Sequence, residues 1–528
     1  MGFGFVGGDC PDQAYLLPPD VRDWLPARHL AWALLEETGR MDLSAFTCWY
    51  RADGQGRPAY HPAMMVALLG YCYCKGIRSS RAIEAATFDD VGARVICGNL
   101  HPDHATAARF IARHEQAVRG LLVASVMACA REGLVTVDVV AGDGTRVRAS
   151  ASMAANATLE VLDAQIAGLE ELVAAEVDAW IAQARAEDAL FGDAGGGDGG
   201  GARPPGAPAP GGKRLAATLA RRREARARLE GAEQARRQEA EAERAERITR
   251  LEARAARSRA SAERAAAAAD RKAQDYQRRA AAKAASGSGR RPDGRAPVSA
   301  SDSGVVRTAR QAAERAAGKL ARALAQPADP GKPGKINTTD PSSKVMLAKN
   351  GGFGQLHNVQ VLAGKHQVVY AITAWPSPAG KAAMHPLLAK GRATLGAAGI
   401  NGPIGAILFD AGYASDANFT APCEGDLHVA VTKEARQAGR LNDGKQPRSA
   451  MESWQQMAAK LATPDGKARY KQRAGIIEPV FAQIFARLGT HLNYRDGKAD
   501  TELHLWAASH NLLKAIRASR HRLAATPA

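Results

Sequence analysis

Two aspartates follow apolar runs in distant parts of the chain. Asp143 follows TVDVVAG and precedes Gly-Thr, and Asp410 follows GAILF and precedes Ala-Gly-Tyr. A carboxylate at the end of a strand projects from a rigid sheet into the crevice where the loops begin, which suits a metal ligand. A third acid, Glu478, precedes Pro479 at the predicted start of an amphipathic helix. Three such acids can hold two Mg²⁺ or Mn²⁺ ions, since these cations prefer hard oxygen ligands.

Two such ions, about 3.5 to 4 Å apart, would clamp the entering and leaving oxygens of a phosphodiester and lower the pKa of an attacking water or hydroxyl. Zinc is disfavoured, because the seven cysteines show no paired CxxC spacing. We interpret these cysteines as reduced thiols of a cytoplasmic protein, mostly in the core. The pattern therefore favours phosphoryl transfer assisted by magnesium or manganese.

Each acid also has a simpler interpretation when it is taken alone. The Asp143-Gly144 step is typical of a hairpin turn, and Asp410 is typical of an Asx turn or a helix cap. Glu478 could favour the positive end of a helix dipole. Asp138, five residues before Asp143, is expected on the opposite face of the strand and is not a candidate. Only the combination of the three acids predicts a metal site.

The region before residue 134 is rich in helix signals and predicts an all-α N-terminal domain at 1–133. Its last predicted helix, at 104–132, starts after the N-cap candidate Asp103. On that helix Arg109 and Arg113 share one face. That face would either lie along a phosphate backbone or simply be solvated.

From Leu134 onward the pattern changes to strands separated by helices, which predicts an α/β domain with a mixed sheet at 134–156 and 336–520. The first strand is expected at 134–143. Two more are expected within 358–374, joined by a turn at Gly364.

Residues 157–335 interrupt this domain with a different composition. Within them, 213–283 contain 21 Lys and Arg against 11 Asp and Glu, so about +10 of the chain's net charge of +17 lies there. This stretch is expected to form either one long solvated helix or an Ala-lined helical hairpin. Further helices are expected at 157–190 and near 307–326, with Gly-, Pro- and Ser-rich linkers between them. We therefore predict a helical, low-complexity insertion.

The whole-chain charge suggests a polyanionic partner, because a basic surface releases counterions when it neutralises phosphates. No window of the sequence approaches the 18 apolar residues that a membrane span needs, so no membrane partner is expected.

Six segments of the chain form a recognisable set: YHPAMMVALLGYCYCKGIRSSRAIE, HPDHATAARFIARH, DGTRVRASAS, LFDAGYAS, YKQRAGIIEPVFAQI and WAASHNLLK. Considered together, they resemble the DDE transposases of bacterial insertion sequences, in the branch with a helical N-terminal domain before an RNase H-like core. The resemblance covers nearly the whole chain outside the insertion. It implies that Asp143, Asp410 and Glu478 are the metal-binding triad.

The same resemblance gives roles to neighbouring residues. Tyr470 and Arg473 match the family's Tyr and Arg that contact DNA near the reacting phosphate, although four residues rather than three separate Arg473 from Glu478. Phe485 stands where the family has a lysine, so that contact would either come from Lys471 or Arg487 or be absent. Arg146 and Arg148, two apart on an extended segment, would either approach the substrate phosphates or line a solvated edge.

The resemblance implies an enzyme that binds the terminal inverted repeats of an element, cuts the element ends and joins their 3′ hydroxyls to target DNA. A homodimer is expected in the synaptic complex, because an element has two ends. Two alternatives stay open: a metal-dependent DNA nuclease that does not join ends, and a transposase-derived DNA-binding protein with a silent core.

Overall fold

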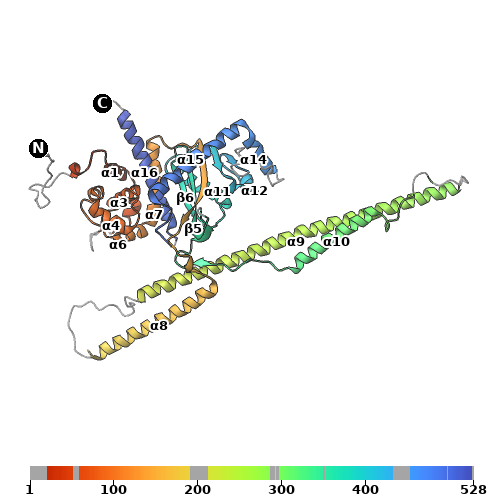
Figure 1. The fold of residues 1–528 in the computed structure, drawn as a ribbon, viewed down its shortest axis with the longest axis horizontal. Coiled ribbons are helices and arrows are strands. Elements are labelled where there is room, and N and C mark those ends of the chain that lie inside the picture. Colours follow the sequence, from red (N-terminus) through yellow and green to blue (C-terminus); the bar gives the residue numbers. More distant parts are fainter. Residues whose placement is uncertain are drawn as a thin grey trace, which may run out of the picture. The chain divides into compact units, whose positions relative to one another are not determined.

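The computed structural model describes residues 21–50, 59–190, 212–285, 292, 296–348, 351–431, 452–495 and 497–525. The chain divides into two compact units. The first combines residues 1–156 with 337–528 and contains the sheet. The second, 157–336, contains long helices. Figure 1 shows both in ribbon form.

A mixed sheet forms the centre of the first unit. Its strand order is β4-β5-β1-β7-β8, and β6 also pairs with β5. Antiparallel pairing joins β5 to β1, β4 and β6, whereas β1, β7 and β8 run parallel. The strands are β1 (Val139–Arg148), β4 (Lys344–Leu347), β5 (Phe353–Gly364), β6 (Val369–Trp375), β7 (Ala406–Phe409) and β8 (Asp426–Val429). The predicted hairpin with its turn at Gly364 is confirmed, and so is the strand that ends at Asp410.

The first strand differs from its predicted bounds. β1 begins at Val139 rather than at 134, and it continues through Asp143 to Arg148. The reason is its partner: β5 pairs with β1 from Val140 to Arg148, which keeps the backbone extended beyond the acid. The Asp143-Gly144 step is therefore strand, and the hairpin-turn interpretation is wrong.

The N-terminal region forms short helices, as predicted. Asp103 caps the sixth of them by accepting a hydrogen bond from Thr106 N at 2.5 Å. The predicted helix at 104–132 is broken, however, at His114, which buries its ring against Phe46 and Phe110. The elements are η1 (Val21–Trp24), α1 (Leu30–Gly39), α2 (Ser44–Thr47), α3 (Pro62–Cys74), α4 (Ser80–Asp89), α5 (Val91–Ile96), α6 (His104–Arg113) and α7 (Glu115–Arg131).

The C-terminal half supplies the helices around the sheet. α15 (Pro464–Leu488) contacts β1, β5 and β7, whereas α11 (Met384–Ala397) contacts β5 and β6. Figure 1 shows α11 and α15 beside the sheet. The remaining elements of this unit are η2 (Met153–Ala155), η3 (Lys381–Ala383), η4 (Ala411–Tyr413), α12 (Asp416–Thr420), α14 (Glu452–Ala462) and α16 (Ala499–Ala525), with the two-residue strands β2 (Asn156–Ala157) and β3 (Ile336–Asn337) at the ends of the insertion.

The N-terminal helices and the sheet share one hydrophobic core, so residue 133 is not a boundary between compact units. The buried Asn511 of α16 shows how they are joined. Its Nδ2 donates to Ser125 Oγ of α7 at 3.1 Å and to the Val369 carbonyl of β6 at 2.9 Å, while Oδ1 accepts from Val369 N at 2.8 Å. One amide thereby fixes α7 and α16 against the sheet.

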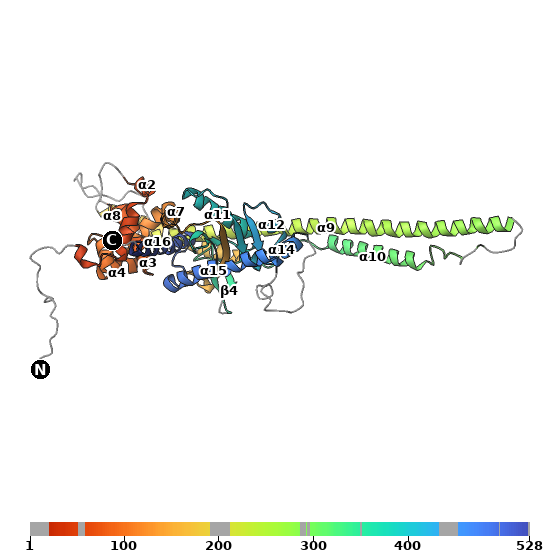
Figure 2. The same ribbon diagram turned by 90° about the horizontal axis from the view of Figure 1, so that it is seen from above.

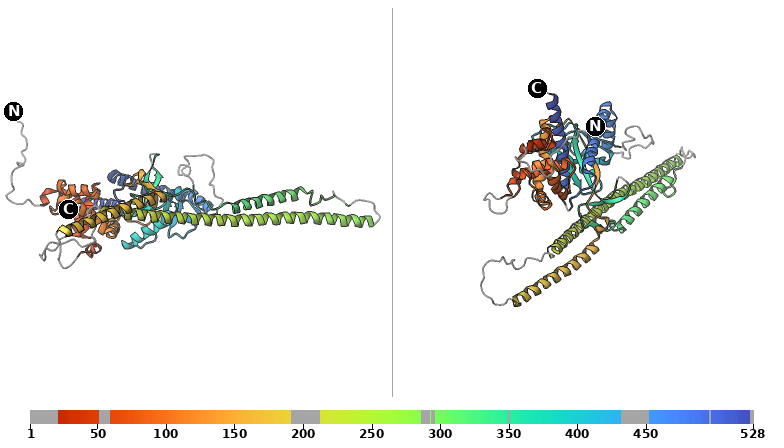
Figure 3. Two further views of the ribbon diagram at one scale, coloured as in Figure 1. Left: turned by 90° about the horizontal axis from the view of Figure 1, so that it is seen from below. Right: turned by 60° about the vertical axis from the view of Figure 1, so that its left-hand side comes forward.

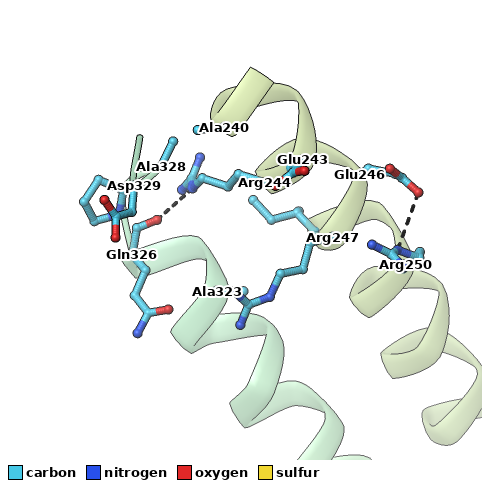
Figure 4. A pocket seen from close by; sticks show the side chains of 12 residues that line it. Ala240, Glu243, Arg244, Glu246, Arg247, Arg250, Ala323, Gln326, Ala328 and Asp329 are labelled. Carbon is cyan, nitrogen blue, oxygen red and sulfur yellow. Dashed lines mark hydrogen bonds and ion pairs between the residues drawn. The ribbon is translucent and has the colours of Figure 1, made fainter. Parts of the chain in front are cut away.

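The insertion is helical, and its basic stretch forms one long helix rather than a hairpin. It contains α8 (Leu159–Leu190), α9 (Gly212–Ala285) and α10 (Gly304–Ala325). Figures 2 and 3 show α10 running alongside α9. Arg244 of α9 donates to the Gln326 carbonyl at 2.7 Å (Figure 4) and to the Leu324 carbonyl at 2.8 Å, which satisfies acceptors at the C-terminal end of α10. Of the predicted linker 191–212, residues 191–211 lie outside the described residues, and so do 286–291 and 293–295 of the predicted linker 286–304.

The cysteines that the structure describes are all free thiols, and four of the six are buried, as expected; Cys10 lies outside the described residues. Among the helices in the described ranges, none has the length and apolar character to cross a membrane.

Candidate active site

The register of the parallel strands brings two of the predicted acids together. Val139 to Ala141 of β1 pair with Ala406 to Leu408 of β7. Two residues further along each strand, Asp143 and Asp410 reach the same level of the sheet. Neighbouring strands lie about 4.8 Å apart, and residues at the same level of paired strands direct their side chains to the same face. Asp143 and Asp410 therefore form a pair of adjacent acids.

The electrostatics of Asp143 reflect this proximity. Burial and, to a smaller extent, the neighbouring Asp410 raise the pKa of Asp143 to about 6. Arg473 of α15 opposes both effects, because its Nη1 donates to Asp143 Oδ2 at 3.2 Å. One guanidinium thus only partly compensates two carboxylates in a largely buried place.

Asp410 has a fixed orientation. It is the N-cap of η4, and its Oδ1 accepts a hydrogen bond from Gly412 N at 3.0 Å. The helix-cap interpretation made from the sequence is therefore correct. It does not conflict with a metal site, because a carboxylate has two oxygens and several lone pairs.

Behind the acids lies a buried polar chain that the sequence did not reveal as a unit. The Tyr413 hydroxyl donates to Gln360 Oε1, and Gln360 Nε2 donates to Asn358 Oδ1 at 2.8 Å. Asn358 Nδ2 in turn donates to the Ser377 carbonyl at 2.9 Å. Burial raises the pKa of Tyr413 well above its usual range, and Asp143 and Asp410 add to the shift. The tyrosine therefore stays protonated and holds η4 against β5.

Glycine at position 142 permits the close packing of the two acidic strands. A Cβ added at Gly142 would lie 2.2 Å from the Phe409 ring of β7. Any side chain there would push β7, and with it Asp410, away from β1.

Glu478 does not share the buried surroundings of the two aspartates. It is exposed, and it lies in the middle of α15 rather than at a helix start, because that helix begins at Pro464. Glu478 is five positions after Arg473, which turns the two side chains about 140° apart around the helix. Arg473 faces the sheet, so Glu478 lies on the outer stripe of α15. The parts of the chain that the structure describes contain no group of three or more His, Cys, Asp or Glu residues placed to hold a metal ion.

Pro479 does not end α15, since another group replaces the missing hydrogen bond. Proline has no N–H, so the carbonyl four residues earlier, that of Gly475, loses its helical donor. Gln367 Nε2 donates to this carbonyl at 3.2 Å. Gln367 lies in the turn after β5 with a φ of 63°, a left-handed conformation that points its side chain toward α15.

The predicted DNA contacts are spread over several surfaces. Arg473 is buried and pairs with Asp143, so it does not lie on an exposed face. Lys471 is exposed and Tyr470 is half-buried on the same helix. Exposed arginines elsewhere are Arg109 and Arg113 on α6, and Arg146 and Arg148 on β1.

Strand geometry separates the β1 arginines from the acid. Asp143, Thr145 and Val147 alternate with Arg146 and Arg148, so the arginines project from the opposite face of the sheet. Arg146 Nη1 donates to the Leu347 carbonyl of β4.

The helical region before the sheet is similar to a known family. Residues 20–113 match the model of a transposase domain (DUF772), a stretch that ends with the last residue of α6. The chain carries a transposase domain. No curated protein and no solved structure matches the chain significantly.

The transposase domain accounts for 94 of the 528 residues, and the acid pair lies outside it. Its helices share the core of the sheet that holds Asp143 and Asp410. The family match and the acid pair are therefore independent observations on one compact unit.

The strained acid pair leads to a prediction about stability. The pKa of Asp143 is raised from about 3.9 in the unfolded chain to about 6 in the folded protein. The folded state therefore binds an extra proton between these values, and stability falls as pH rises through this window. In EDTA at pH 8, Asp143→Asn should raise the free energy of unfolding by about 1–3 kcal/mol, and this gain should vanish as the pH falls toward 4.

Urea unfolding at pH 8 and pH 4 measures the effect. Asp138→Asn is the control, because Asp138 lies 3.7 Å from Lys365 at the surface and its pKa is lowered rather than raised by its net surroundings. A gain equal at both pH values, or no gain at pH 8, would contradict an electrostatic conflict at Asp143.

Proposed function

We propose that this protein is a DDE-type DNA transposase whose catalytic cation is held by Asp143 and Asp410. The observation that carries the proposal is the adjacent acid pair on parallel strands of a chain with a transposase domain. The strand arrangement is compatible with an RNase H-like core, since β1, β5 and β6 are joined by antiparallel pairing and are followed along the chain by β7 and β8, which run parallel to β1.

The residues present fit a divalent cation. Two carboxylates with hard oxygen atoms lie side by side. Burial raises the pKa of Asp143 and repulsion from Asp410 adds to the shift, so a positive ion between the two carboxylates would stabilise their charged forms. Asp143 and Asp410 would hold Mg²⁺ or Mn²⁺, and a second ion would need a further acid such as Glu478. When bound, the cation supplies charge stabilisation for the oxygens that enter and leave the phosphorus.

The chain's own residues position and orient the reacting groups. Arg473 holds one oxygen of Asp143, and the Gly412 amide holds one oxygen of Asp410, so both carboxylates have fixed directions. The chain from Tyr413 to Gln360 keeps the loop after β7 in place. Fixed groups of this kind need no reorganisation when charge develops on the phosphate.

The partner in this proposal is double-stranded DNA, both the terminal inverted repeats and the target. The N-terminal helices would recognise the repeats, with Arg109 and Arg113 of α6 against the phosphate backbone. The enzyme would act in the cytoplasm of a bacterium, as a homodimer when two ends are paired.

The exposure of Glu478 favours one second candidate, a transposase-derived DNA-binding protein without catalysis. One assay separates the candidates. Labelled element ends, target DNA and Mg²⁺ are supplied to the full chain, and joined product is expected. Cut but unjoined ends would support a nuclease instead, and bound but unchanged ends would support the binding protein.

A further inference from the structure

A cavity of about 490 Å³ lies at the C-terminal end of α15, away from the acid pair. Its lining includes three basic side chains: Arg487 of α15, and Lys514 and Arg517 of α16. No Asp or Glu is among the residues that line it. The cavity is within the size range of ligand sites, about 300–1,000 Å³. Its walls therefore carry positive charge without a matching negative charge.

The walls of this cavity are held in place by Gln367 from the turn after β5. Lys514 Nζ and Gln483 Nε2 both donate to Gln367 Oε1, at 3.1 and 3.0 Å. His510 lies 2.9 Å from the Gln367 carbonyl oxygen. Burial lowers the pKa of His510 to about 3, with smaller contributions from the three cations. This histidine is therefore neutral, and its role is structural.

The cations of the cavity repel each other and are only partly satisfied. Burial lowers the pKa of Lys514 and of Arg487, and the charge of Arg517 lowers both further. Arg487 Nη2 donates to Ser509 Oγ at 3.3 Å, but its buried Nε has no hydrogen-bond partner. A buried N–H without a partner is costly, so the site would gain from an acceptor that carries negative charge.

We propose that Arg487, Lys514 and Arg517 form a binding site for a backbone phosphate of DNA. The proposal rests on the proposed function for its choice of polyanion. A phosphate oxygen offers the acceptor and the charge that these walls lack, and Arg and Lys are its usual partners. Arg487 lies 14 residues after Arg473 on one helix, about 21 Å along the axis. In a DNA duplex that runs along this helix, about six base pairs would separate the phosphate at this site from the phosphate at the acid pair.

A phosphate contact carries no sequence information, so an arbitrary 30-base-pair duplex is a suitable probe. Binding is measured in EDTA between 50 and 200 mM salt. In the double variant Lys514→Gln/Arg517→Gln, we expect about tenfold weaker binding and a slope of log affinity against log salt that is reduced by about 1.

Three further variants make the test specific. Arg522→Gln removes a charge from the same helix, but from a residue 3.0 Å from Glu132, and should leave the slope unchanged. Lys514→Arg keeps the charge and should retain wild-type binding. Arg487→Gln removes the cation that donates to Ser509 Oγ and should reduce the slope in the same direction. Circular dichroism checks that each variant is folded.

A free phosphate-type anion offers the cavity the same charged oxygen acceptors as a DNA phosphate. Pyrophosphate that raises the melting temperature of the wild type but not of the double variant, with an unchanged DNA slope, would overturn the DNA assignment. An unchanged slope without any pyrophosphate effect would overturn the site altogether. Because these measurements need neither a metal ion nor catalysis, they can succeed where strand joining fails, and the reverse.

Discussion

Asp143→Asn and Asp410→Asn are each expected to reduce strand joining by about a thousandfold or more. An amide keeps the shape of the carboxylate but removes the charge that would hold the cation. Losing about 4 kcal/mol of charge stabilisation at the reacting phosphate corresponds to this factor. DNA binding should remain, because the two acids repel rather than attract phosphates. The measurement is joined product from labelled ends with Mg²⁺, beside duplex binding in EDTA.

A readout that does not depend on activity accompanies this test. Mg²⁺ should raise the melting temperature of the wild type, because a ligand that binds only the folded state stabilises it. Neither asparagine variant should respond to the ion. Asp138→Asn, which lies outside the acid pair, should both join DNA and respond to Mg²⁺. Full joining by either active-site variant would exclude that aspartate from the mechanism.

Glu478→Gln decides the role of the third acid. If Glu478 holds a cation during catalysis, α15 has to present a different face from the one it shows here, and the variant loses joining as severely as the two asparagine variants. If joining persists, the exposed position of Glu478 on the outer stripe of α15 is its working position.

Features that depend on neighbours in the sequence could be predicted. Asp103 caps a helix because its side chain reaches a backbone amide three residues ahead. The strand before Asp410 and the turn at Gly364 follow from apolar runs and a glycine. The end of β1 could not be predicted, since Arg146 and Arg148 look polar enough to end a strand and only the pairing with β5 keeps them extended.

The candidate site could be predicted only in part, because its contacts join residues that are distant in the sequence. Asp143 and Asp410 each follow a buried strand, so their type and position could be recognised. The pairing of Asp143 with Arg473 and the hydrogen bond from Tyr413 to Gln360 join residues more than 50 positions apart, and no local pattern marks them. Glu478 was expected to start a helix because proline usually does so. In the structure the side-chain amide of Gln367 donates to the Gly475 carbonyl in place of the N–H that Pro479 lacks, so the proline lies inside the helix.

Arg78→Met is expected to destabilise the folded protein by about 3–5 kcal/mol, which is the usual cost of leaving one member of a buried ion pair without its partner. Arg78 lies between α3 and α4, and its Nη1 donates to Glu502 Oε1 of α16 at 3.1 Å and to the His491 carbonyl at 2.6 Å. Glu502 is fully buried, and its Oε2 accepts from the amides of Asn493 and Tyr494 at 2.7 and 2.9 Å. This pair connects the transposase domain to the last helix.

The loss of stability in Arg78→Met should grow as the pH rises. Burial already raises the pKa of Glu502, and Arg78 opposes that shift, so removing Arg78 raises the pKa of Glu502 further. The folded variant then binds a proton that the unfolded chain has released, and its stability falls as pH rises above about 4.3. Urea unfolding should therefore show a smaller deficit at pH 5 than at pH 8. Adding Glu502→Gln to Arg78→Met should recover part of the loss, because no buried charge is then left unpaired.

Arg40→Met is the matched control, since Arg40 pairs with Glu36 and Glu37 at the surface with half of its side chain exposed. Exposed pairs contribute about 0–1 kcal/mol, so this variant should unfold nearly as the wild type does. Equal losses in Arg78→Met and Arg40→Met would mean that the buried pair is not what holds α3 and α4 to α16. A large loss restricted to Arg78→Met would instead explain how the helices of the transposase domain keep a fixed position beside the sheet that carries the two aspartates.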